Sequence, residues 1–431
     1  MNPPTPPTAV PVPVPSEPGE PAGSAGSAAA PAWDAARPQG FPMRRGCPFS
    51  PPEDYARLRT EEPVARVTLP TGREAWVVSR YEDVRELLAD PRISADIRRP
   101  NFPALGEGEQ EVGARLRPFI RTDAPEHTRY RRMLLPEFTV RRIRAMRPAV
   151  QAIVDGLLDS MLASGGPVDF VPVYANAVST SVICELLGIP KENLEFFRDV
   201  TRVSGSRAST AEQVAEALGG LFALISDLVA RRQEEPGDDL LSKLVTGHLR
   251  TGNVTLPELL STVGITINAG RETSTNMIAL SALLLIQRPD LADELRADPS
   301  LMPAAVDELL RVMSIADSIP LRVAAQDIEI SGTVVPADDG VIGLLAAANH
   351  DPEQFPDPDR VDFHRPDNHH VAFGYGVHQC IGQHLARLEL EVALETLIRR
   401  VPTLRLAVPY EEVEFKHDSA TFGIERLPVT W

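Results

Sequence analysis

Residues 373–387 read FGYGVHQCIGQHLAR and set a cysteine, Cys380, at the end of a glycine-containing loop. Apolar residues at helical spacing follow, so a helix is predicted over residues 381–398. The unpaired N–H groups and the dipole of a helix start favour a thiolate. His378 can bond an anion nearby, and three glycines allow the backbone to approach a large flat group: Gly374, Gly376 and Gly382. This combination predicts a thiolate that holds the metal of a planar cofactor, and haem iron is the leading candidate.

Three other interpretations of this loop are weaker. The nucleotide-binding pattern is not met, because Gln379 stands where its third glycine would be and no phosphate-binding lysine follows. A buried, inert cysteine is the commonest fate of a free thiol, but it leaves the glycines unexplained. A zinc site would have to combine one cysteine with irregularly spaced histidines, from the set His369, His370, His378, Cys380 and His384.

A long helix is predicted upstream of this loop. Thr255 can cap a helix start, Glu258 can return the hydrogen bond, and Pro257 is tolerated in the first turn. No strong stop follows before Pro289, which gives about 33 residues and roughly 50 Å. A helix so long and so apolar should cross the centre of the molecule.

Residues 268–274, NAGRETS, lie in the middle of this predicted helix. Gly270 weakens the helix, and the Thr273 hydroxyl can donate to the carbonyl of Ala269, which opens the backbone ladder locally. Glu272 lies beside that alcohol, so the segment offers room for a ligand and a relay for protons. Taken alone, the segment is explained better by a solvent-facing glutamate and a core threonine.

The composition is that of an ordinary globular protein, with 431 residues, 43% of them hydrophobic and 24% charged. A net charge of −17 argues against nucleic acid as the main partner. Three cysteines make no disulfide framework, and neither a signal peptide nor an apolar run of membrane length is recognised, so we expect a cytoplasmic protein that makes no membrane contact. Residues 1–40 hold 11 of the 41 prolines and are expected to form a disordered tail.

Short strands and many helices are expected in the rest of the chain. Strands are predicted at 64–69 and 74–79, and a second hairpin at 328–330 and 333–335. Helical periodicity dominates elsewhere, most clearly over residues 150–163. The predicted fold is therefore mainly α with small β-sheets, in one domain over residues 41–431.

The loop FGYGVHQCIG (373–382) is similar to the haem-binding signature of the cytochromes P450, the haem-thiolate monooxygenases. Three further segments resemble family features in the expected order: PEHTRYRR (125–132), AGRETS (269–274) and DELLR (307–311). The resemblance covers roughly residues 45–431 and is closest to soluble bacterial members that oxidise polyketide macrolides, secosteroids and xenobiotics. It implies the P450 fold, in which a long central helix passes over haem b.

The resemblance assigns roles to residues of this chain. Cys380 is the iron ligand, and Glu272 and Thr273 serve catalysis by delivering protons. Glu308 and Arg311 form a structural ion pair that locks the haem loop to residues 357–366 through Arg360 or Arg365. The buried haem propionates need cations. The residues expected to contact the cofactor are His127, Arg131, Ala269, Gly270, Arg322, Phe373, Gly374, His378, Cys380 and Gly382.

A substrate pocket is expected on the face of the haem opposite the thiolate. Its candidate residues are Asn268, Ile319, Leu321, Thr421 and Phe422. Relatives often have an apolar residue where this chain has Asn268. We expect its amide to hydrogen-bond a polar group of the substrate, although an amide satisfied by the backbone explains the residue equally well.

The implied function is monooxygenation by a monomer: hydroxylation or epoxidation of a bulky, mostly apolar small molecule with O2 and electrons from an external ferredoxin and its reductase. Residues 115–147 hold ten arginines against three acids, which predicts a basic surface, including Arg132, that steers an acidic ferredoxin. A solvated helix face is the alternative for these arginines. The alternative function is a peroxide-driven haem-thiolate oxidase or a non-oxygenating haem-dependent binding protein, but the intact acid–alcohol pair favours the monooxygenase.

Overall fold

The computed structural model describes residues 39–106, 108–193, 196–197, 199–200, 203, 209–317, 319–417 and 419–431. Positions 1–38 of the expected tail lie outside the described residues. The last two residues assigned to that tail, Gln39–Gly40, form a short strand, β1, that pairs in parallel with Val67 and Thr68. These two residues therefore belong to the fold and not to the expected tail.

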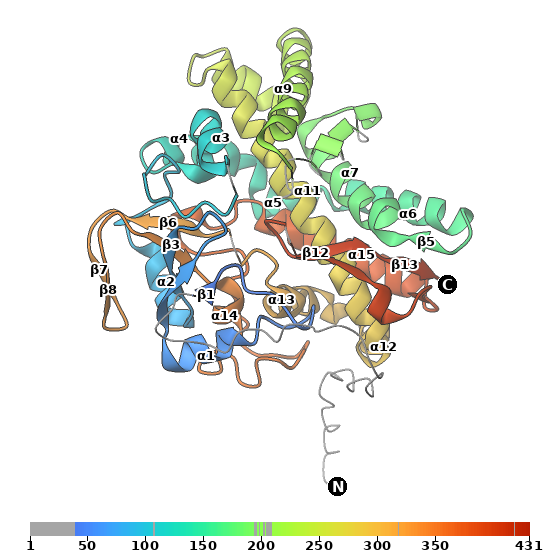
Figure 1. The fold of residues 1–431 in the computed structure, drawn as a ribbon. Coiled ribbons are helices and arrows are strands. Elements are labelled where there is room, and N and C mark those ends of the chain that lie inside the picture. Colours follow the sequence, from blue (N-terminus) through green and yellow to red (C-terminus); the bar gives the residue numbers. More distant parts are fainter. Residues whose placement is uncertain are drawn as a thin grey trace.

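Helices build most of the described chain (Figure 1). The predicted helix at 150–163 is present as α6, and the helix after the cysteine loop begins two residues later than predicted, as α15. The α-helices are α1 Asp54–Glu61, α2 Tyr81–Ala89, α3 Glu109–Leu116, α4 Glu126–Leu134, α5 Val140–Ala145, α6 Arg147–Ala163, α7 Asn176–Leu187, α9 Ala211–Glu234, α10 Leu240–Leu244, α11 Leu256–Gln287, α12 Pro289–Ala297, α13 Met302–Met313, α14 Leu345–Asn349 and α15 Gln383–Arg400.

The strands of the described residues form one six-stranded sheet and three small ones. Both predicted hairpins are present as antiparallel pairs, β2 with β3 and β7 with β8. The large sheet has the order β1-β2-β3-β9-β6-β4, and the small sheets are β10-β13-β5, β11-β12 and β7-β8. The strands are β1 Gln39–Gly40, β2 Val64–Thr68, β3 Glu74–Val78, β4 Ile93–Ser94, β5 Val168–Asp169, β6 Leu321–Ala324, β7 Ile328–Ile330, β8 Thr333–Val335, β9 Gly340–Gly343, β10 Arg405–Leu406, β11 Glu414–Lys416, β12 Gly423–Arg426 and β13 Pro428–Thr430.

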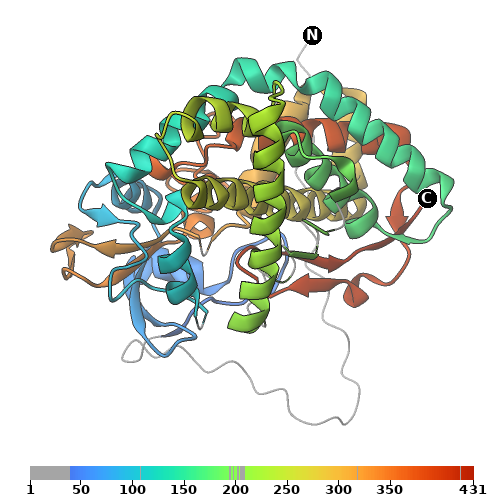
Figure 2. The same cartoon turned by 90° about the horizontal axis from the view of Figure 1, so that it is seen from above.

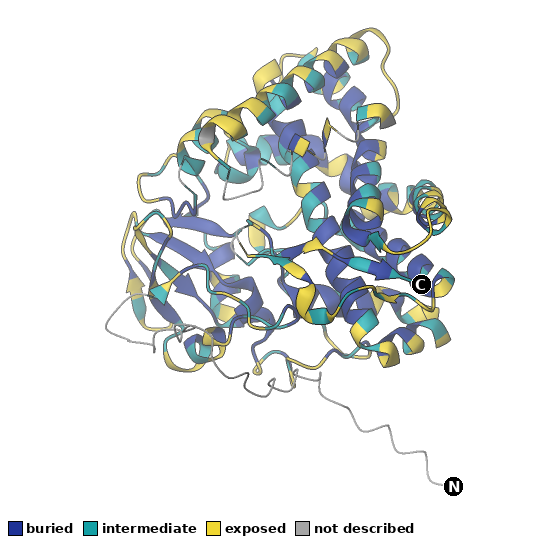
Figure 3. Cartoon of the chain, turned by 45° about the vertical axis from the view of Figure 1, so that its right-hand side comes forward, coloured by how far each residue is buried: buried dark blue, intermediate teal, exposed yellow. Residues whose placement is uncertain are grey.

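The predicted central helix is α11, 32 residues long, and it crosses the molecule between the other helices (Figure 1). It packs against α7, α15 and α13, and α9 crosses over it in the view from above (Figure 2). Its residues 274–285 are buried throughout. The helix therefore forms the axis of the main hydrophobic core, and the buried residues gather around it and in the sheet (Figure 3).

The start of α11 is fixed by one carboxylate that serves two elements. Glu258 closes the predicted capping box by accepting from the Thr255 N–H at 2.7 Å. Its other oxygen accepts from Arg129 at 2.5 Å and from the Tyr130 hydroxyl at 2.8 Å, and both of these residues belong to α4. These charge-assisted bonds hold the pKa of Glu258 well below its usual value despite partial burial. The junction fixes the position of α4 relative to the central helix.

In the described part of the chain, one helix, α9, is long and apolar enough over residues 212–234 to cross a bilayer by length and composition alone. The sequence-based expectation that no such segment exists considered only uninterrupted apolar runs. It missed α9 because scattered charges interrupt the apolar stretch of this helix. In the structure α9 packs against α11 and α10.

Candidate active site

The cysteine loop folds back on itself at its two ends. The Cys380 N–H donates to the Phe373 carbonyl at 2.9 Å, and the Gly374 N–H donates to the Val371 carbonyl at 2.7 Å. Gly374 has a φ of 68°, so a side chain there would strain the backbone. Gly376 is required for a different reason than expected: a Cβ atom there would lie 2.3 Å from the Leu88 carbonyl oxygen of α2. The absence of a side chain at Gly376 therefore allows the loop to pack on α2.

The thiol of Cys380 is exposed, yet protein atoms surround it at longer range. Desolvation by these atoms raises the pKa of Cys380, while the Gly382 N–H and the charges of Arg131 and Arg387 act to lower it. The lowering of the thiol pKa that the helix start was expected to cause is thus present, but desolvation outweighs it. A coordinated metal cation deprotonates a thiol outright, so the donor suits a metal better than it suits a free thiolate.

Helix α4 carries two of the predicted cofactor residues to the cysteine loop. Arg131 Nη2 donates to the Gln379 carbonyl at 2.6 Å, directly before Cys380. One turn earlier, the ring of His127 lies against the ring of His378, with centroids 3.9 Å apart. The predicted spacing of four residues therefore places both side chains on the helix face that meets the loop.

Positive charge is concentrated around these two histidines. Burial, then repulsion from Arg131 and Arg322, lowers the pKa of His127 to about 4. Burial and repulsion from Arg121 lower the pKa of Arg322 to about 9, and only 8% of Arg322 is exposed. The pKa of His378 is lowered as well, by burial and by the same cations.

This cluster of buried cations fits the propionates of a haem. Asp123 is the acid whose charge acts on both His127 and Arg322, and its oxygens already accept from Ser94 and the Ala95 N–H. His127 Nε2 is buried and has no hydrogen-bond partner among the described residues. Two carboxylates placed here would supply both the missing acceptor and the missing negative charge. The residues present therefore fit the cofactor that the sequence implies.

The middle of α11 is more accessible than the segment that follows it. Ala269 is exposed and its neighbours Asn268 and Gly270 are partly so, whereas residues 274–285 are buried. The Thr273 hydroxyl donates to the Ala269 carbonyl at 2.7 Å, as predicted from their spacing. Gly270 is also required for helix packing, because a Cβ atom there would lie 2.8 Å from Ile183 Cδ1. Its missing side chain allows α7 to approach α11.

The Glu272 carboxylate contacts a segment that the sequence did not connect to it. Its Oε1 accepts from Ser419 at 2.9 Å and from Thr421 at 3.4 Å, in the turn between β11 and β12. The acid beside Thr273 is therefore held by the C-terminal hairpin. No local pattern could have indicated this contact, because 147 residues separate Glu272 from Ser419.

The five candidate pocket residues come from three parts of the chain: the middle of α11, the start of β6 and the turn before β12. Asn268 is partly buried, and its Oδ1 has no hydrogen-bond partner among the described residues. Ile319 is partly exposed, and its carbonyl accepts from Arg121 at 3.2 Å. Both therefore remain candidates for contact with a substrate.

The other three candidates make contacts within the protein. Leu321 is 1% exposed and belongs to the core beneath the large sheet, because side chains alternate along β6 and Arg322 takes the opposite face. Thr421 is 3% exposed and directs its hydroxyl to α11. Phe422 stacks on Phe415, with centroids 5.9 Å apart, beneath the guanidinium of Arg45.

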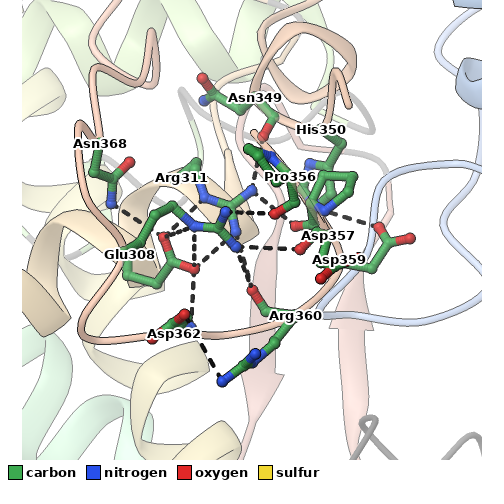
Figure 4. A network of polar contacts seen from close by, with 12 residues as sticks. Glu308, Arg311, Asn349, His350, Pro356, Asp357, Asp359, Arg360, Asp362 and Asn368 are labelled. Atoms are coloured by element: carbon green, nitrogen blue, oxygen red, sulfur yellow. Dashed lines mark hydrogen bonds and ion pairs between the residues drawn. The ribbon is translucent and has the colours of Figure 1, made fainter. Parts of the chain in front are cut away.

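The predicted pair of Glu308 and Arg311 is present and lies in the centre of a larger network (Figure 4). Arg365 donates to Glu308 through its Nε atom at 3.1 Å. Arg360 contributes its main-chain carbonyl instead, which accepts from Arg311 at 3.2 Å. Of the two arginines considered, Arg365 is therefore the one whose guanidinium bonds Glu308, whereas the guanidinium of Arg360 pairs with Asp362 at 3.8 Å.

His370, ahead of the cysteine loop, belongs to the scaffold. His370 Nε2 lies 3.2 Å from Asp307 Oδ1, which also accepts from Arg387 at 2.7 Å. Arg387 in turn lies over the ring of Phe373, 4.6 Å from its centroid. Among the described residues, no group of three or more His, Cys, Asp or Glu side chains could hold a metal ion, so the zinc alternative finds no ligand set.

Six of the ten arginines of residues 115–147 are paired with acids. Arg115, Arg117, Arg121, Arg129, Arg142 and Arg147 have carboxylate partners, most of them outside that stretch. Counting charge within the stretch alone therefore overestimated the basic surface. Three arginines make no hydrogen bond or ion pair with the described residues and are exposed: Arg132, Arg141 and Arg144.

Comparison with known proteins gives one consistent result. The family model described as cytochrome P450 matches residues 207–404. Pentalenic acid synthase of Streptomyces avermitilis is 45% identical over 401 residues, which cover 93% of this chain and 99% of that protein. Vitamin D3 dihydroxylase of Streptomyces griseolus is 45% identical over 392 residues, covering 91% and 96%.

The solved structures agree with these sequence matches. CYP105N1 from Streptomyces coelicolor A3(2) superimposes with a TM-score of 0.87 at 79% identity, over 92% of this chain and 99% of that one. A second structure of it is described as a cytochrome P450 oxidase in the coelibactin siderophore biosynthetic pathway, with a TM-score of 0.85 at 78% identity over 91% and 100% of the chains. The mycinamicin VIII C21 methyl hydroxylase of Micromonospora griseorubida has a TM-score of 0.86 at 44% identity, over 91% and 100%.

Proposed function

This chain belongs to the cytochrome P450 family, and from that premise we propose that it is a ferredoxin-dependent monooxygenase whose haem iron is held by Cys380. The enzyme class and the haem b cofactor follow from the family. The observation that carries the assignment of the site is the cluster of buried cations beside the cysteine loop, with the unpartnered Nε2 of His127 at its centre. We place the enzyme in the cytoplasm as a monomer.

The mechanism assigns separate tasks to the residues of the chain. The Cys380 thiolate binds the iron, and Arg131, Arg322, His127 and His378 hold the propionates. When bound, the haem supplies the activation of O2. The chain itself orients the substrate and excludes water. Glu272 and the Thr273 hydroxyl deliver protons along the accessible middle of α11, which is why the intact pair favours monooxygenation over peroxide-driven or non-oxygenating chemistry.

The experiment that tests this site is the carbon monoxide difference spectrum of the reduced protein, recorded beside a Cys380→Ala variant. We expect a strongly red-shifted Soret band in the wild type that is absent from the variant. A band typical of histidine ligation in the wild type, or the same red-shifted band in both proteins, would reject Cys380 as the ligand. A folded wild type without any haem signal would reject the function itself.

An acidic ferredoxin is the partner that best suits the surface near the cysteine loop. The three unpaired arginines Arg132, Arg141 and Arg144 lie on α4 and α5, and exposed apolar side chains accompany them. Leu135 and Val140 are 44% and 40% exposed, and Val377 in the cysteine loop is 69% exposed. An apolar centre with a cationic surround is typical of a docking surface for an anionic protein.

The substrate is a bulky small molecule, and two classes are favoured by different observations. Relatives named for secosteroid and macrolide hydroxylation are 43–45% identical to this chain, which supports a mostly apolar substrate. The 78–79% identity with CYP105N1 supports an intermediate of siderophore biosynthesis. The unpartnered amide oxygen of Asn268 favours the second class, because it requires an N–H or O–H donor from a ligand.

Spin-state titration with a panel of macrolides, secosteroids and peptide-like siderophore precursors separates the two classes. We expect the donor-bearing precursors to bind most tightly and to lose about tenfold in affinity in Asn268→Ala, while apolar ligands bind both proteins equally. Tighter binding of an apolar macrolide or secosteroid, unaffected by Asn268→Ala, would reject the siderophore class and the role of Asn268.

A further inference from the structure

The C-terminal hairpin meets the central helix through polar side chains at the position of Glu272. The hairpin consists of β11, Glu414–Lys416, and β12, Gly423–Arg426, and its connecting turn supplies the hydroxyls of Ser419 and Thr421 to the Glu272 carboxylate. The contact is close: a Cβ atom on Gly423 would lie 2.2 Å from Asn276 Oδ1. The hairpin and α11 therefore pack directly at this point.

A chain of hydrogen bonds runs from a lysine of the hairpin to this carboxylate. Lys416 Nζ donates to Asn276 Oδ1 at 3.2 Å, Asn276 Nδ2 donates to Thr421 Oγ1 at 2.9 Å, and the Thr421 hydroxyl donates to Glu272 Oε1 at 3.4 Å. Every donor points toward the carboxylate, so the ammonium charge polarises each bond in the same sense. Asn276 is completely buried and Thr421 is 3% exposed, so solvent hardly screens the chain.

Lys416 is an unusual residue for this place. The chain has only three lysines, and burial lowers the pKa of this one while the charge of Glu272 acts against that shift. Burying an ammonium group costs free energy unless a partner compensates. Its ammonium group donates to Asn276 and hence connects toward Glu272.

We propose that Lys416 is a positioning residue for the proton relay: through Asn276 and Thr421 it retains the Glu272 carboxylate on the C-terminal hairpin and so sets the orientation from which protons are delivered. The inference rests on the proposed role of Glu272 in proton delivery. It makes the hairpin part of the catalytic apparatus, although Lys416 itself touches neither substrate nor cofactor in this scheme.

The test uses the infrared stretch of carbon monoxide bound to the reduced holoenzyme, which senses nearby charge and needs neither substrate nor redox partner. Glu272→Gln defines the signature of a lost carboxylate. We expect Lys416→Met and Thr421→Val to broaden or split the band toward that signature, and Lys416→Arg to restore it. Glu414→Gln, a charge removed from the same strand but outside the chain of bonds, is the matched control and should leave the band unchanged.

Turnover with a surrogate ferredoxin system supplies the second measurement. We expect Lys416→Met and Thr421→Val to lower product formed per NADPH consumed by about fivefold, with the loss appearing as hydrogen peroxide. Thr421→Val keeps the side-chain volume, so it remains informative if Lys416→Met folds poorly. Bands and coupling ratios identical to the wild type in both variants would overturn the positioning role. A wild type without a thiolate-type carbon monoxide complex would instead reject the proposed function.

Discussion

Arg311 donates from Nε and Nη2 to the two oxygens of Glu308, each at 2.8 Å, and each of the two side chains is at most 1% exposed. Such a two-bond pair has ideal geometry, and each of its two residues makes further hydrogen bonds. Glu308 also accepts from Arg365, Asn368 and the Asp362 N–H, while Arg311 also donates to three carbonyls. The pair thereby fastens α13 to residues 349–368.

Loss of one partner of this pair should be severely destabilising. Glu308→Gln leaves the Arg311 charge buried without its counter-charge, and we expect a loss of about 3–5 kcal/mol in the free energy of unfolding. Urea denaturation of the purified protein measures this. Arg360→Gln is the control, because the Arg360 carbonyl that accepts from Arg311 is retained and only a half-exposed ion pair with Asp362, at 3.8 Å, is lost, so stability should change by less than about 1 kcal/mol. Equal losses in the two variants would contradict the structural role of the pair.

The buried cation Arg322 should determine how long the haem is retained. Arg322→Leu removes a charge-assisted hydrogen bond to a propionate, so we expect haem to dissociate roughly ten- to a hundredfold faster. Transfer of haem to an excess of an apoprotein acceptor, followed by absorbance, gives the rate. Arg399→Leu removes an exposed arginine at the end of α15 and should leave the rate unchanged.

A surface charge reversal should weaken docking of the electron donor. Arg132→Glu replaces an exposed, unpaired cation by an anion, so we expect ferredoxin to bind about tenfold more weakly at low salt, with a smaller dependence of affinity on salt. Titration at several ionic strengths measures both quantities. Arg399→Glu carries the same change in net charge at a distant position. If the two variants behave alike, the surface around Arg132 is not the docking site.

Glu389 should make the stability depend on pH. This carboxyl of α15 is 2% exposed between the hydroxyls of Ser179 and Ser274, and burial raises its pKa from 4.5 to about 7. Between these values the folded protein binds a proton that the unfolded chain releases, so stability should fall as pH rises from about 4.5 to about 7 and then level off. The full effect is about 3 kcal/mol.

The substitution Glu389→Gln removes this titration. We expect the variant to gain melting temperature over the wild type at pH 8 but not at pH 5, because only the ionised wild type carries a buried charge. Glu395→Gln, on the same helix, is the control for loss of a carboxylate. A constant difference between Glu389→Gln and the wild type at both pH values would show that Glu389 is not the titrating group.

Local chemistry predicted those features of the fold that depend on neighbours in sequence. The capping box at Thr255 and Glu258 sets the start of α11, and the turn residues between β2 and β3 set that hairpin. The spacing of His127 and Arg131 was also sufficient to predict that both side chains meet the cysteine loop, since residues four apart share a helix face. In each of these cases the determining contact lies within a few residues.

The features that the sequence could not indicate depend on contacts between distant segments. Leu321 and Arg322 are neighbours on a strand, and only the packing of β6 decides which of them faces the core. Gly270 is explained by Ile183 of α7, and the link from Lys416 to Asn276 spans 140 residues. The charge count around α4 was misleading for the same reason, because the neutralising acids come from elsewhere in the chain.

The shared carboxylate of Glu258 has a consequence for recombination between related enzymes. Arg129 and Tyr130 come from α4, whereas Glu258 and Thr255 come from the start of α11, so a crossover anywhere between residues 131 and 254 takes the two halves of this junction from different parents. A chimaera keeps the junction only when both parents encode matching partners. Exchanges of the intervening segment, with both ends taken from one parent, avoid that constraint and allow α6 to α10 to be replaced as a block.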